Sequence, residues 1–400
     1  MQPKQHTAMH ADLFQKFASI YQKEALNAFF APGRVNLIGE HVDYNGGLVL
    51  PCAIEYGTTL YTAPNNDNVF RLRSLNFDEV IEVPLADAYT KEAELWYNFP
   101  LGVAHHFLKD GHKLEGLDML YSGDIPIGSG LSSSASIEIV TAYAFNELFA
   151  SGYSKLDLVK MAKSVENNFI GLSSGIMDQF AVTFGEKDKA MAISCDTLNY
   201  DLVSANLGDY VLAIINTKKP RKLVESKYNE RVEECAAALK ALRQRLDIED
   251  LCDIDVAAFE QNEHLITDAT VKKRARHVIE ENERVKQAIS VLAKNNLAEF
   301  GQLMYASHNS LQHLYEVSGI ELDTIVDYAK TNVDVVGARM TGGGFGGCAI
   351  ALVKKEGFNN FSNEVTSYYE EKIGYAPAVY QQCIGNGVGA LTIIKTTVNK

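Results

Sequence analysis

Two carboxylates and one arginine stand out as residues able to do chemistry. Glu166 and Asp178 lie twelve positions apart with a turn-forming Ser-Ser-Gly between them, and Arg34 lies in a Pro-Gly loop beside further ionisable side chains. A carboxylate can take up a proton or hold a hard cation, and a guanidinium is permanently charged. Taken alone, the two carboxylates would be interpreted as surface groups flanking a loop, so other motifs must decide.

A glycine- and serine-rich run provides the first of these motifs. Residues 128–136 read GSGLSSSAS and lead directly into a helical pattern with Ile137, Val140, Ala144 and Leu148 on one face. Glycines admit a polyphosphate close to the backbone, and the free N–H groups of a helix start favour anions. No lysine follows the glycines and no HRD or DFG triplet is present, so neither a P-loop enzyme nor a protein kinase is indicated. The alternative is a flexible loop with a serine N-cap.

A second glycine run, between residues 342 and 347, fits GxGxxG by letter. A dinucleotide fingerprint must open a helix, whereas residues 348–353 form a strand-like apolar run. The run therefore predicts a glycine-rich turn between two strands.

The elements that must position these motifs form an α+β pattern without repeats. Short strands are expected at residues 27–30, 48–54, 69–72 and 117–122, and residues 210–215 look like the first strand of a new unit, which places a domain boundary near residue 200. Residues 271–294 predict a surface helix with Val278, Val285, Ile289 and Leu292 on its inner side and its charges on a solvated face.

Composition narrows the class of protein. A chain of 400 residues with 46% hydrophobic content can bury two cores and form a cleft between them. A net charge of −14 argues against nucleic-acid and anionic-membrane partners. The scattered cysteines predict reduced thiols, and the histidines lack metal-binding spacing, so no zinc site is expected. Without a membrane-length apolar run or a signal-peptide core, we expect a cytoplasmic protein.

Three segments together identify a family. Residues 31–45 read APGRVNLIGEHVDYN and residues 337–347 read GARMTGGGFGG; with the glycine-serine run they resemble the GHMP small-molecule kinases, and the first is similar to the galactokinase signature. Matching stretches lie at residues 28–54, 124–136, 160–197 and 337–352, so the resemblance spans nearly the whole chain. The resemblance implies an N-terminal ribosomal-protein-S5-like α/β domain, residues 1–200, and a C-terminal ferredoxin-like α+β domain, residues 201–400. The site would lie in the interdomain cleft.

The resemblance also implies the reaction and its residues. ATP with Mg²⁺ would phosphorylate the C1 hydroxyl of galactose, with Asp178 as the base and Arg34 as its partner. A nearby cation lowers the pKa of an aspartate and weakens it as a base, so the sequence leaves open whether Asp178 removes the proton fully or mainly orients the hydroxyl. The galactose pocket would comprise Glu40, His41, Asp43, Gly175 and Tyr228, with Asp43 reading the C3 and C4 hydroxyls. The nucleotide would be held by Ser74, Trp96, Gly128, Ser129, Gly130, Leu131, Ser132, Ser133 and Ser134, and Mg²⁺ by Ser134 and Glu166.

Three functions stay open on the sequence. Galactokinase activity is favoured, a related kinase for N-acetylgalactosamine or arabinose comes second, and a non-catalytic galactose and ATP sensor comes third, although nothing needed for catalysis is missing. One departure is Ser174, where many galactokinases have cysteine; we expect little consequence. No obligate protein partner is expected.

Overall fold

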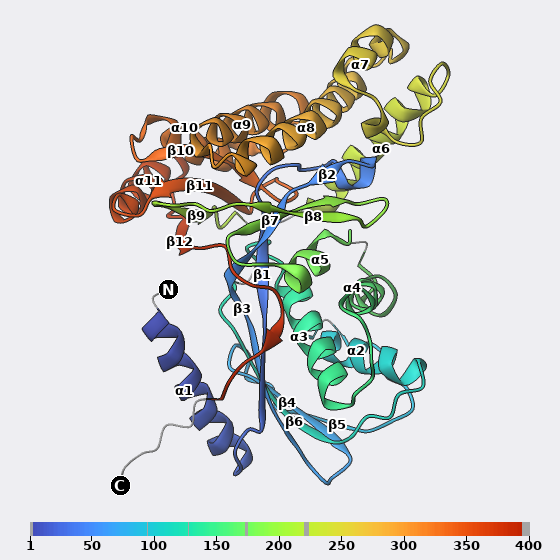
Figure 1. The fold of residues 1–400 in the computed structure, drawn as a ribbon, viewed down its shortest axis with the longest axis vertical. Coiled ribbons are helices and arrows are strands. Elements are labelled where there is room, and N and C mark those ends of the chain that lie inside the picture. The colour runs from blue at the N-terminus through green and yellow to red at the C-terminus, as the bar shows by residue number, and fades with distance from the viewer. Residues whose placement is uncertain (1–2, 94, 127, 173–174, 220–223, 394–400) are drawn as a thin grey trace.

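The structure is a computed structural model that describes residues 3–93, 95–126, 128–172, 175–219 and 224–393. Its lower part in Figure 1 is built on a six-stranded sheet with the order β13–β1–β3–β6–β4–β5. The strands are β1 (Asn27–Asn36), β3 (Pro51–Pro64), β4 (Val69–Ser74), β5 (Ile81–Pro84), β6 (Leu117–Gly123) and β13 (Gly389–Ala390).

Helices cover both faces of this sheet, because successive residues of a strand point to opposite sides. Leu60 of β3 joins the core cluster formed with α2, α3 and α4, whereas Tyr61 packs with Leu13 and Phe17 of α1. Figure 1 shows α1 alone on one side and the other helices opposite it. These helices are α1 (Pro3–Tyr21), α2 (Asn98–Lys109), α3 (Ser133–Leu148), α4 (Lys155–Ser164), η2 (Val165–Ile170) and α5 (Met177–Phe184).

The upper part contains an antiparallel sheet of order β10–β11–β9–β12. Its strands are β9 (Tyr210–Asn216), β10 (Val335–Thr341), β11 (Cys348–Lys354) and β12 (Ala378–Gln382). A smaller sheet, β2–β7–β8, lies between the two parts in Figure 1 and consists of β2 (Leu48–Val49), β7 (Lys189–Ser194) and β8 (Tyr200–Ser204).

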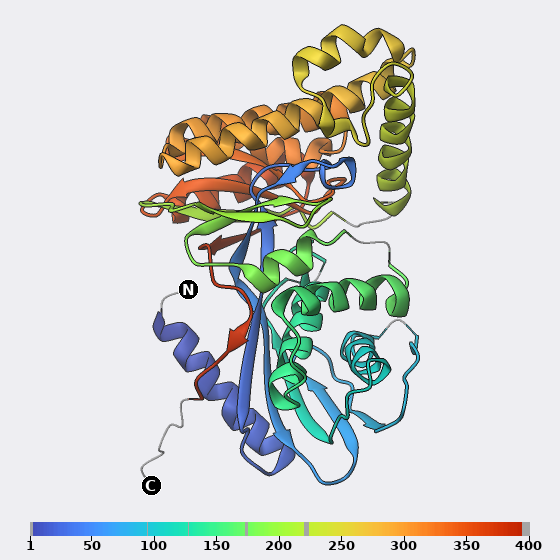
Figure 2. The same ribbon diagram turned by 45° about the vertical axis from the view of Figure 1, so that its right-hand side comes forward.

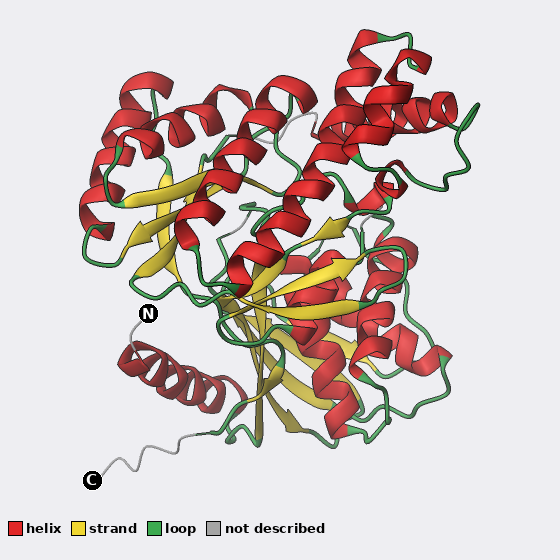
Figure 3. Ribbon diagram, turned by 45° about the horizontal axis from the view of Figure 1, so that its top comes forward, coloured by secondary structure: helices red, strands yellow, loops and turns green. Residues whose placement is uncertain are grey.

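Helices α9 (Leu297–Ser310), α10 (Gly319–Thr331) and α11 (Phe358–Ile373) pack on the four-stranded sheet, which Figure 3 shows with the top of the molecule turned forward. Helix α8 (Ala269–Ala293) packs beside α9, and α6 (Val224–Leu242) and α7 (Val256–Asn262) pack against α8. The short turns are η1 (Asp43–Asn45), η3 (Leu251–Asp253), η4 (Glu263–Leu265) and η5 (Leu311–Tyr315). None of the helices in the described ranges is long and apolar enough to cross a membrane.

The predicted strands and the glycine-rich turn are confirmed, since β10 and β11 flank residues 342–347. The prediction of α8 is right in its extent, and charged residues such as Lys273 and Lys286 are exposed as expected, but the prediction is wrong for part of the polar face. Arg274, His277 and Glu281 are buried, because the helix packs against polar loops and backbone as well as against apolar side chains.

The domain boundary near residue 200 stays a prediction, and one segment crosses it. β13 pairs with β1 through Phe29 and Ala390, and Ile54 bridges to Ile384. Figure 2 shows this late segment beside the first strands of the chain. The strand β13 therefore belongs to the same sheet as β1 and β3.

A bulge in β1 brings the glycine-serine loop to the strand. The register with β3 shifts between Pro32 and Arg34, and a Cβ on the intervening Gly33 would lie 2.6 Å from the carbonyl oxygen of Leu131. The Arg34 N–H donates to that same carbonyl at 3.2 Å. Only glycine permits this approach, which places Arg34 beside the loop.

Candidate active site

Arg34 and Asp178 form a two-point ion pair. Nε of Arg34 donates to Oδ1 of Asp178 at 2.8 Å and Nη2 donates to Oδ2 at 2.7 Å, while Nη1 donates to the carbonyl of Gly130 at 2.7 Å. Arg34 comes from β1 and Asp178 from the first turn of α5. The expected contact between Arg34 and Asp178 is therefore present, and the rigid guanidinium group fixes the orientation of the carboxylate.

Ser132 provides a third contact to this pair. It occupies the N-cap position of α3 with a left-handed φ of 64°, but its side chain makes no cap hydrogen bond. Its hydroxyl donates instead to Oδ2 of Asp178 at 2.6 Å. Ser132 was expected to bind phosphate, but its hydroxyl is hydrogen-bonded to the Asp178 carboxylate instead.

A cavity of about 150 Å³ lies in front of the ion pair, and we call it the polar cavity. All the residues expected at the galactose pocket line this cavity, namely Glu40, His41, Asp43, Gly175 and Tyr228. Segments from both halves of the chain form its walls. Its walls are Arg34, Asn36, Gly39, Glu40, His41, Asp43, Gly175, Met177, Asp178, Tyr228, Gly342 and Gly343.

Asp43 is a carboxyl group of this cavity whose pKa is shifted toward neutrality. Burial, together with the negative charge of Asp178, raises the pKa of Asp43 to about 6. A Cβ placed on Gly175 would lie 3.1 Å from Oδ2 of Asp43, so this glycine keeps the carboxylate unobstructed. Ser174, next to it, lies outside the described residues.

His41 is neutral and held by protein on both ring nitrogens. Burial lowers the pKa of His41 to about 3. Nε2 lies 3.2 Å from the carbonyl oxygen of Gly343, so it donates, and Nδ1 accepts from the hydroxyl of Tyr44 at 2.8 Å. The hydroxyl of Tyr44 accepts in turn from Tyr315 at 2.8 Å. His41 thus contributes to the cavity by fixing the glycine-rich turn.

A second cavity, of about 200 Å³, is mainly apolar, and we call it the aromatic cavity. It brings together Ser74, Trp96, Ser133 and Ser134, all expected at the nucleotide. The ring of Phe77 stacks on Trp96 at 6.0 Å between centroids. Residues that the sequence reasoning missed complete the walls: Thr58, Asn76, Phe77, Phe99, Tyr121, Gly123, Ile125 and Ile137. An exposed aromatic in the polar loop after β4 was the signal available for Phe77.

The remaining residues of the glycine-serine loop divide by exposure. Gly128 and Gly130 are exposed and have φ of 72° and 76°, which favours glycine. Ser129 and Leu131 are buried, and the Ser129 hydroxyl has no hydrogen-bond partner among the described residues. These four contribute the shape of the loop but do not line the aromatic cavity.

The expected Mg²⁺ ligands fit a hard cation by their chemistry. Glu166 is buried, and one of its oxygens accepts from Nε2 of Gln179 at 2.8 Å. Glu138, one helical turn after Ser134 on α3, is fully buried, and neither of its carboxylate oxygens has a partner within the described ranges. Burial and the charge of Glu166 raise the pKa of Glu138 well above its usual range. Unpaired oxygens beside Glu166 suit Mg²⁺, which prefers oxygen ligands. The sequence reasoning missed Glu138 and Gln179.

Comparison with known proteins identifies the class and then the family. The GHMP kinases N terminal domain matches residues 98–186 and the GHMP kinases C terminal domain matches residues 288–371. The galactokinase galactose-binding signature matches residues 15–64. The fold is also that of a mevalonate kinase, with a TM-score of 0.69 at 21% identity over 90% of this chain and 99% of that one.

Relatives of higher sequence identity are galactokinases. The galactokinase of Clostridium tetani is 47% identical and that of Enterococcus faecalis is 47% identical, covering 94% and 95% of this chain and 96% and 99% of theirs. The crystal structure of Lactococcus lactis galactokinase complexed with galactose has a TM-score of 0.89 at 45% identity, covering 95% of this chain and 99% of that one. The chain belongs to the galactokinase family of the GHMP kinases.

Proposed function

We propose that the chain transfers the γ-phosphoryl group of ATP to the C1 hydroxyl of α-D-galactose, giving galactose 1-phosphate and ADP. The observation that carries the proposal is the Arg34–Asp178 ion pair. This pair lines the polar cavity on one side and contacts the glycine-serine loop through Gly130 and Ser132 on the other. A base and a cation at the junction of a sugar cavity and a phosphate loop suit phosphoryl transfer to a hydroxyl.

Asp178 orients the C1 hydroxyl and takes its proton as the bond from that oxygen to the γ-phosphorus forms. The bond from the γ-phosphorus to the bridging oxygen breaks at the same time, and ADP leaves with its electron pair. Arg34 is permanently charged, so it stabilises negative charge that accumulates on the transferred group. Ser132 and Arg34 together hold Asp178 in one orientation, which supports alignment as its main contribution.

The phosphates would be held by the start of α3. Backbone N–H groups there are free of helix partners, and the helix dipole favours anions. Ser134 and Glu166 would hold Mg²⁺, which would supply positive charge to neutralise the phosphates. The aromatic cavity suits the adenine, because Trp96 and Phe77 offer flat apolar surfaces for a planar base.

Galactose recognition is assigned to the polar cavity. Glu40 and Asp43 present carboxylate acceptors, and Tyr228 presents a hydroxyl, so ring hydroxyls at fixed positions can be distinguished. His41 fixes the glycine-rich turn at Gly343, and Gly175 leaves the Asp43 carboxylate unobstructed. The galactokinase signature and the galactose-bound relative both favour galactose over other sugars.

An ADP-release assay with galactose, glucose, N-acetylgalactosamine, arabinose and mevalonate tests the proposal. We expect galactose to give the highest kcat/KM, with glucose at least tenfold lower because its C4 hydroxyl points elsewhere. A preference for N-acetylgalactosamine or arabinose would retain the kinase chemistry and change the substrate. Absence of ADP release with every sugar would refute catalysis and leave a sensor.

A further inference from the structure

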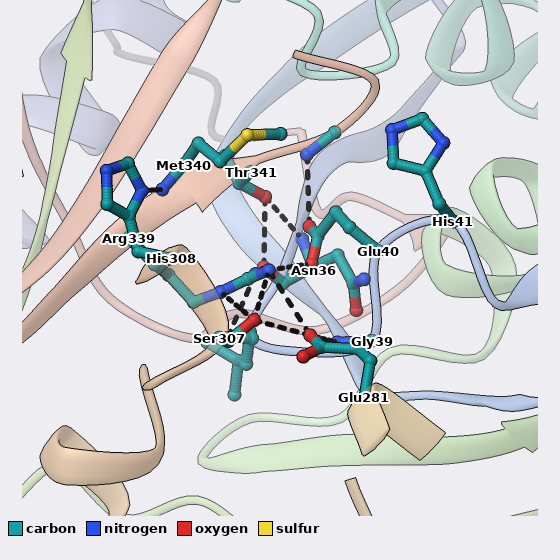
Figure 4. A network of polar contacts seen from close by, with 12 residues as sticks. Asn36, Gly39, Glu40, His41, Glu281, Ser307, His308, Arg339, Met340 and Thr341 are labelled. Carbon is teal, nitrogen blue, oxygen red and sulfur yellow. Dashed lines mark hydrogen bonds and ion pairs between the residues drawn. The ribbon is translucent and has the colours of Figure 1, made fainter. Parts of the chain in front are cut away.

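Arg339 is a fully buried cation behind the polar cavity. It lies on β10, three residues before the first glycine of the glycine-rich turn, and has no exposed surface. Figure 4 shows its guanidinium reaching the carboxylate of Glu40, with which it forms an ion pair. Glu40 lines the polar cavity, whereas Arg339 does not. A buried charge of this kind requires several partners.

Those partners come from separate parts of the chain. Nη2 and Nε of Arg339 donate to the Ser307 hydroxyl at 3.0 Å and 3.2 Å, and Nη1 donates to the carbonyls of Asn36 and Leu37 at 3.5 Å and 3.4 Å. Arg339 also lies 3.6 Å from Glu281. Helix α9 and the end of β1 thus meet at one side chain.

Glu281 completes the network from α8. It accepts from the backbone N–H of Gly39 at 3.1 Å and from the Ser307 hydroxyl, and it pairs with Arg284 at 2.7 Å. Burial opposes its ionisation, yet Arg284 and Arg339 bring the pKa of Glu281 down to about 2. An ionised Glu281 therefore holds the backbone immediately before Glu40.

Glu40 itself is used on both carboxylate oxygens. Oε1 accepts from the N–H of Gly342 at 3.0 Å, and Oε2 meets Arg339. Burial raises the pKa of Glu40, and Arg339 opposes that effect. Without Arg339 the carboxylate would lose its fixed direction and its charge partner.

We propose that Arg339, supported by Ser307 and Glu281, is a positioning residue that holds the Glu40 carboxylate as a hydrogen-bond acceptor for the sugar. The proposal rests on the proposed function, in which Glu40 binds a galactose hydroxyl. In this proposal Arg339 increases the affinity for the sugar without contacting the sugar. It also explains why a cation is retained where an apolar residue would cost less to bury.

Arg339→Met and the milder Ser307→Ala test this role. We expect galactose to bind 10- to 100-fold more weakly to Arg339→Met, as measured by calorimetry without nucleotide, and about threefold more weakly to Ser307→Ala. KM for ATP should stay within twofold, and kcat at saturating galactose within a few fold. If Arg339→Met does not fold, Ser307→Ala tests the same role with a smaller expected loss of galactose affinity.

Arg274→Met is the matched control. Arg274 is a similarly buried arginine on α8, but its partners are Glu234, Glu316 and the carbonyl of Leu314, none of which lines the polar cavity. It should lower thermal stability as much as Arg339→Met does, without changing galactose affinity. Equal loss of galactose affinity in both variants would overturn the positioning role.

A double-mutant cycle with Glu40→Gln decides whether Arg339 acts through Glu40. If it does, Arg339→Met should weaken galactose binding little further in the Glu40→Gln background. Fully additive losses, or a folded Arg339→Met protein with wild-type galactose affinity, would overturn the proposal. Failure of the proposed function is a separate result, because it appears as wild-type protein that neither binds nor phosphorylates galactose.

Discussion

Ser132 gives its hydroxyl to Asp178, at 2.6 Å, and not to the backbone of the helix that it precedes. Serine before a helix usually caps it. Here the left-handed backbone at Ser132 turns the side chain away from the free N–H groups and toward α5. The start of α3 therefore keeps its N–H groups for an anion, while the same residue orients the proposed base.

Replacing Ser132 with alanine separates these two uses. Ser132→Ala should lower kcat about tenfold, the effect of losing one hydrogen bond to a charged group, with little change in the unfolding midpoint. Ser154→Ala is the contrast, because Ser154 caps α4 by accepting from the N–H of Asp157. That variant should lose about 1 kcal/mol of stability and keep its kcat. The reverse pattern would show that Ser132 is a cap.

Asp178→Asn preserves shape and removes the charge. We expect turnover of galactose to fall by at least ~10²-fold, the usual effect of removing a general base. KM for ATP should be nearly unchanged. Asp209→Asn, at an exposed position in the loop before β9, is the control. Wild-type turnover by Asp178→Asn would remove it from the mechanism.

Glu166→Gln should raise the Mg²⁺ concentration needed for half-maximal activity, because an amide is a weaker ligand for a hard cation. Mn²⁺ binding measured by electron paramagnetic resonance in the presence of ATP provides a readout independent of turnover. Glu147→Gln, exposed on α3, should behave as wild type. Identical metal titrations for both variants would exclude Glu166 as a ligand.

Asp43 predicts a pH dependence of sugar binding. Burial and the charges of Asp178 and Glu40 raise the pKa of Asp43 to about 6. The Asp43 carboxylate therefore becomes protonated as the pH falls through 6. The KM for galactose should therefore rise below pH 6 in the wild type. Asp43→Asn should weaken galactose binding at pH 8 and flatten this dependence, and the comparison requires only steady-state kinetics from pH 5 to 8.

The same shift has a consequence for stability with a defined sign. A folded-state pKa above the ordinary 3.8 means that ionised Asp43 destabilises the fold at pH 7, by about 3 kcal/mol for a shift to about 6. Asp43→Asn should accordingly unfold at higher temperature than wild type at pH 7, and this advantage should shrink as the pH falls from 6 toward 4. A lower midpoint at pH 7 would contradict the shift.

Trp96 is the only tryptophan of the chain and lines the aromatic cavity. Adding ATP or ADP should change its fluorescence, whereas galactose alone should change it little. Phe77→Ala should weaken nucleotide binding by roughly tenfold, because an aromatic contact of this kind contributes about 0.5–1.5 kcal/mol beyond its buried area. A fluorescence response to galactose and none to nucleotide would reverse the assignment of the two cavities.

The sequence predicted the strands and the glycine-rich turns, because each depends on a short motif with strong local preferences. The contact of Arg34 with Asp178, 144 residues later, followed instead from the charges of the two groups and from the resemblance. Through the resemblance it also named Glu40, His41, Asp43, Gly175 and Tyr228, which all line the polar cavity, but not Asn36, Gly39 or Met177. Their separation in the chain is wide, so spacing alone could not have grouped Glu40 with Tyr228.

What the sequence could not predict depends on contacts between distant segments. The charged side of α8 fits a solvated surface by its 3.6-residue period, yet Glu281 packs against the backbone at Gly39. Likewise Ser132 is a normal N-cap by residue type, and only the left-handed φ at that position redirects it. Phe77 lacked a periodic context altogether, since it lies in a loop.

The pairing of Phe29 with Ala390 imposes an order on assembly. During synthesis the first sheet emerges early, but its edge at β1 stays open until residues 389–390 have left the ribosome. Exposed strand edges invite pairing with other chains, and contacts this remote in sequence form late. The nascent protein must therefore keep the edge at β1 unpaired until β13 has been synthesised, and a fragment ending before β13 would expose that edge permanently.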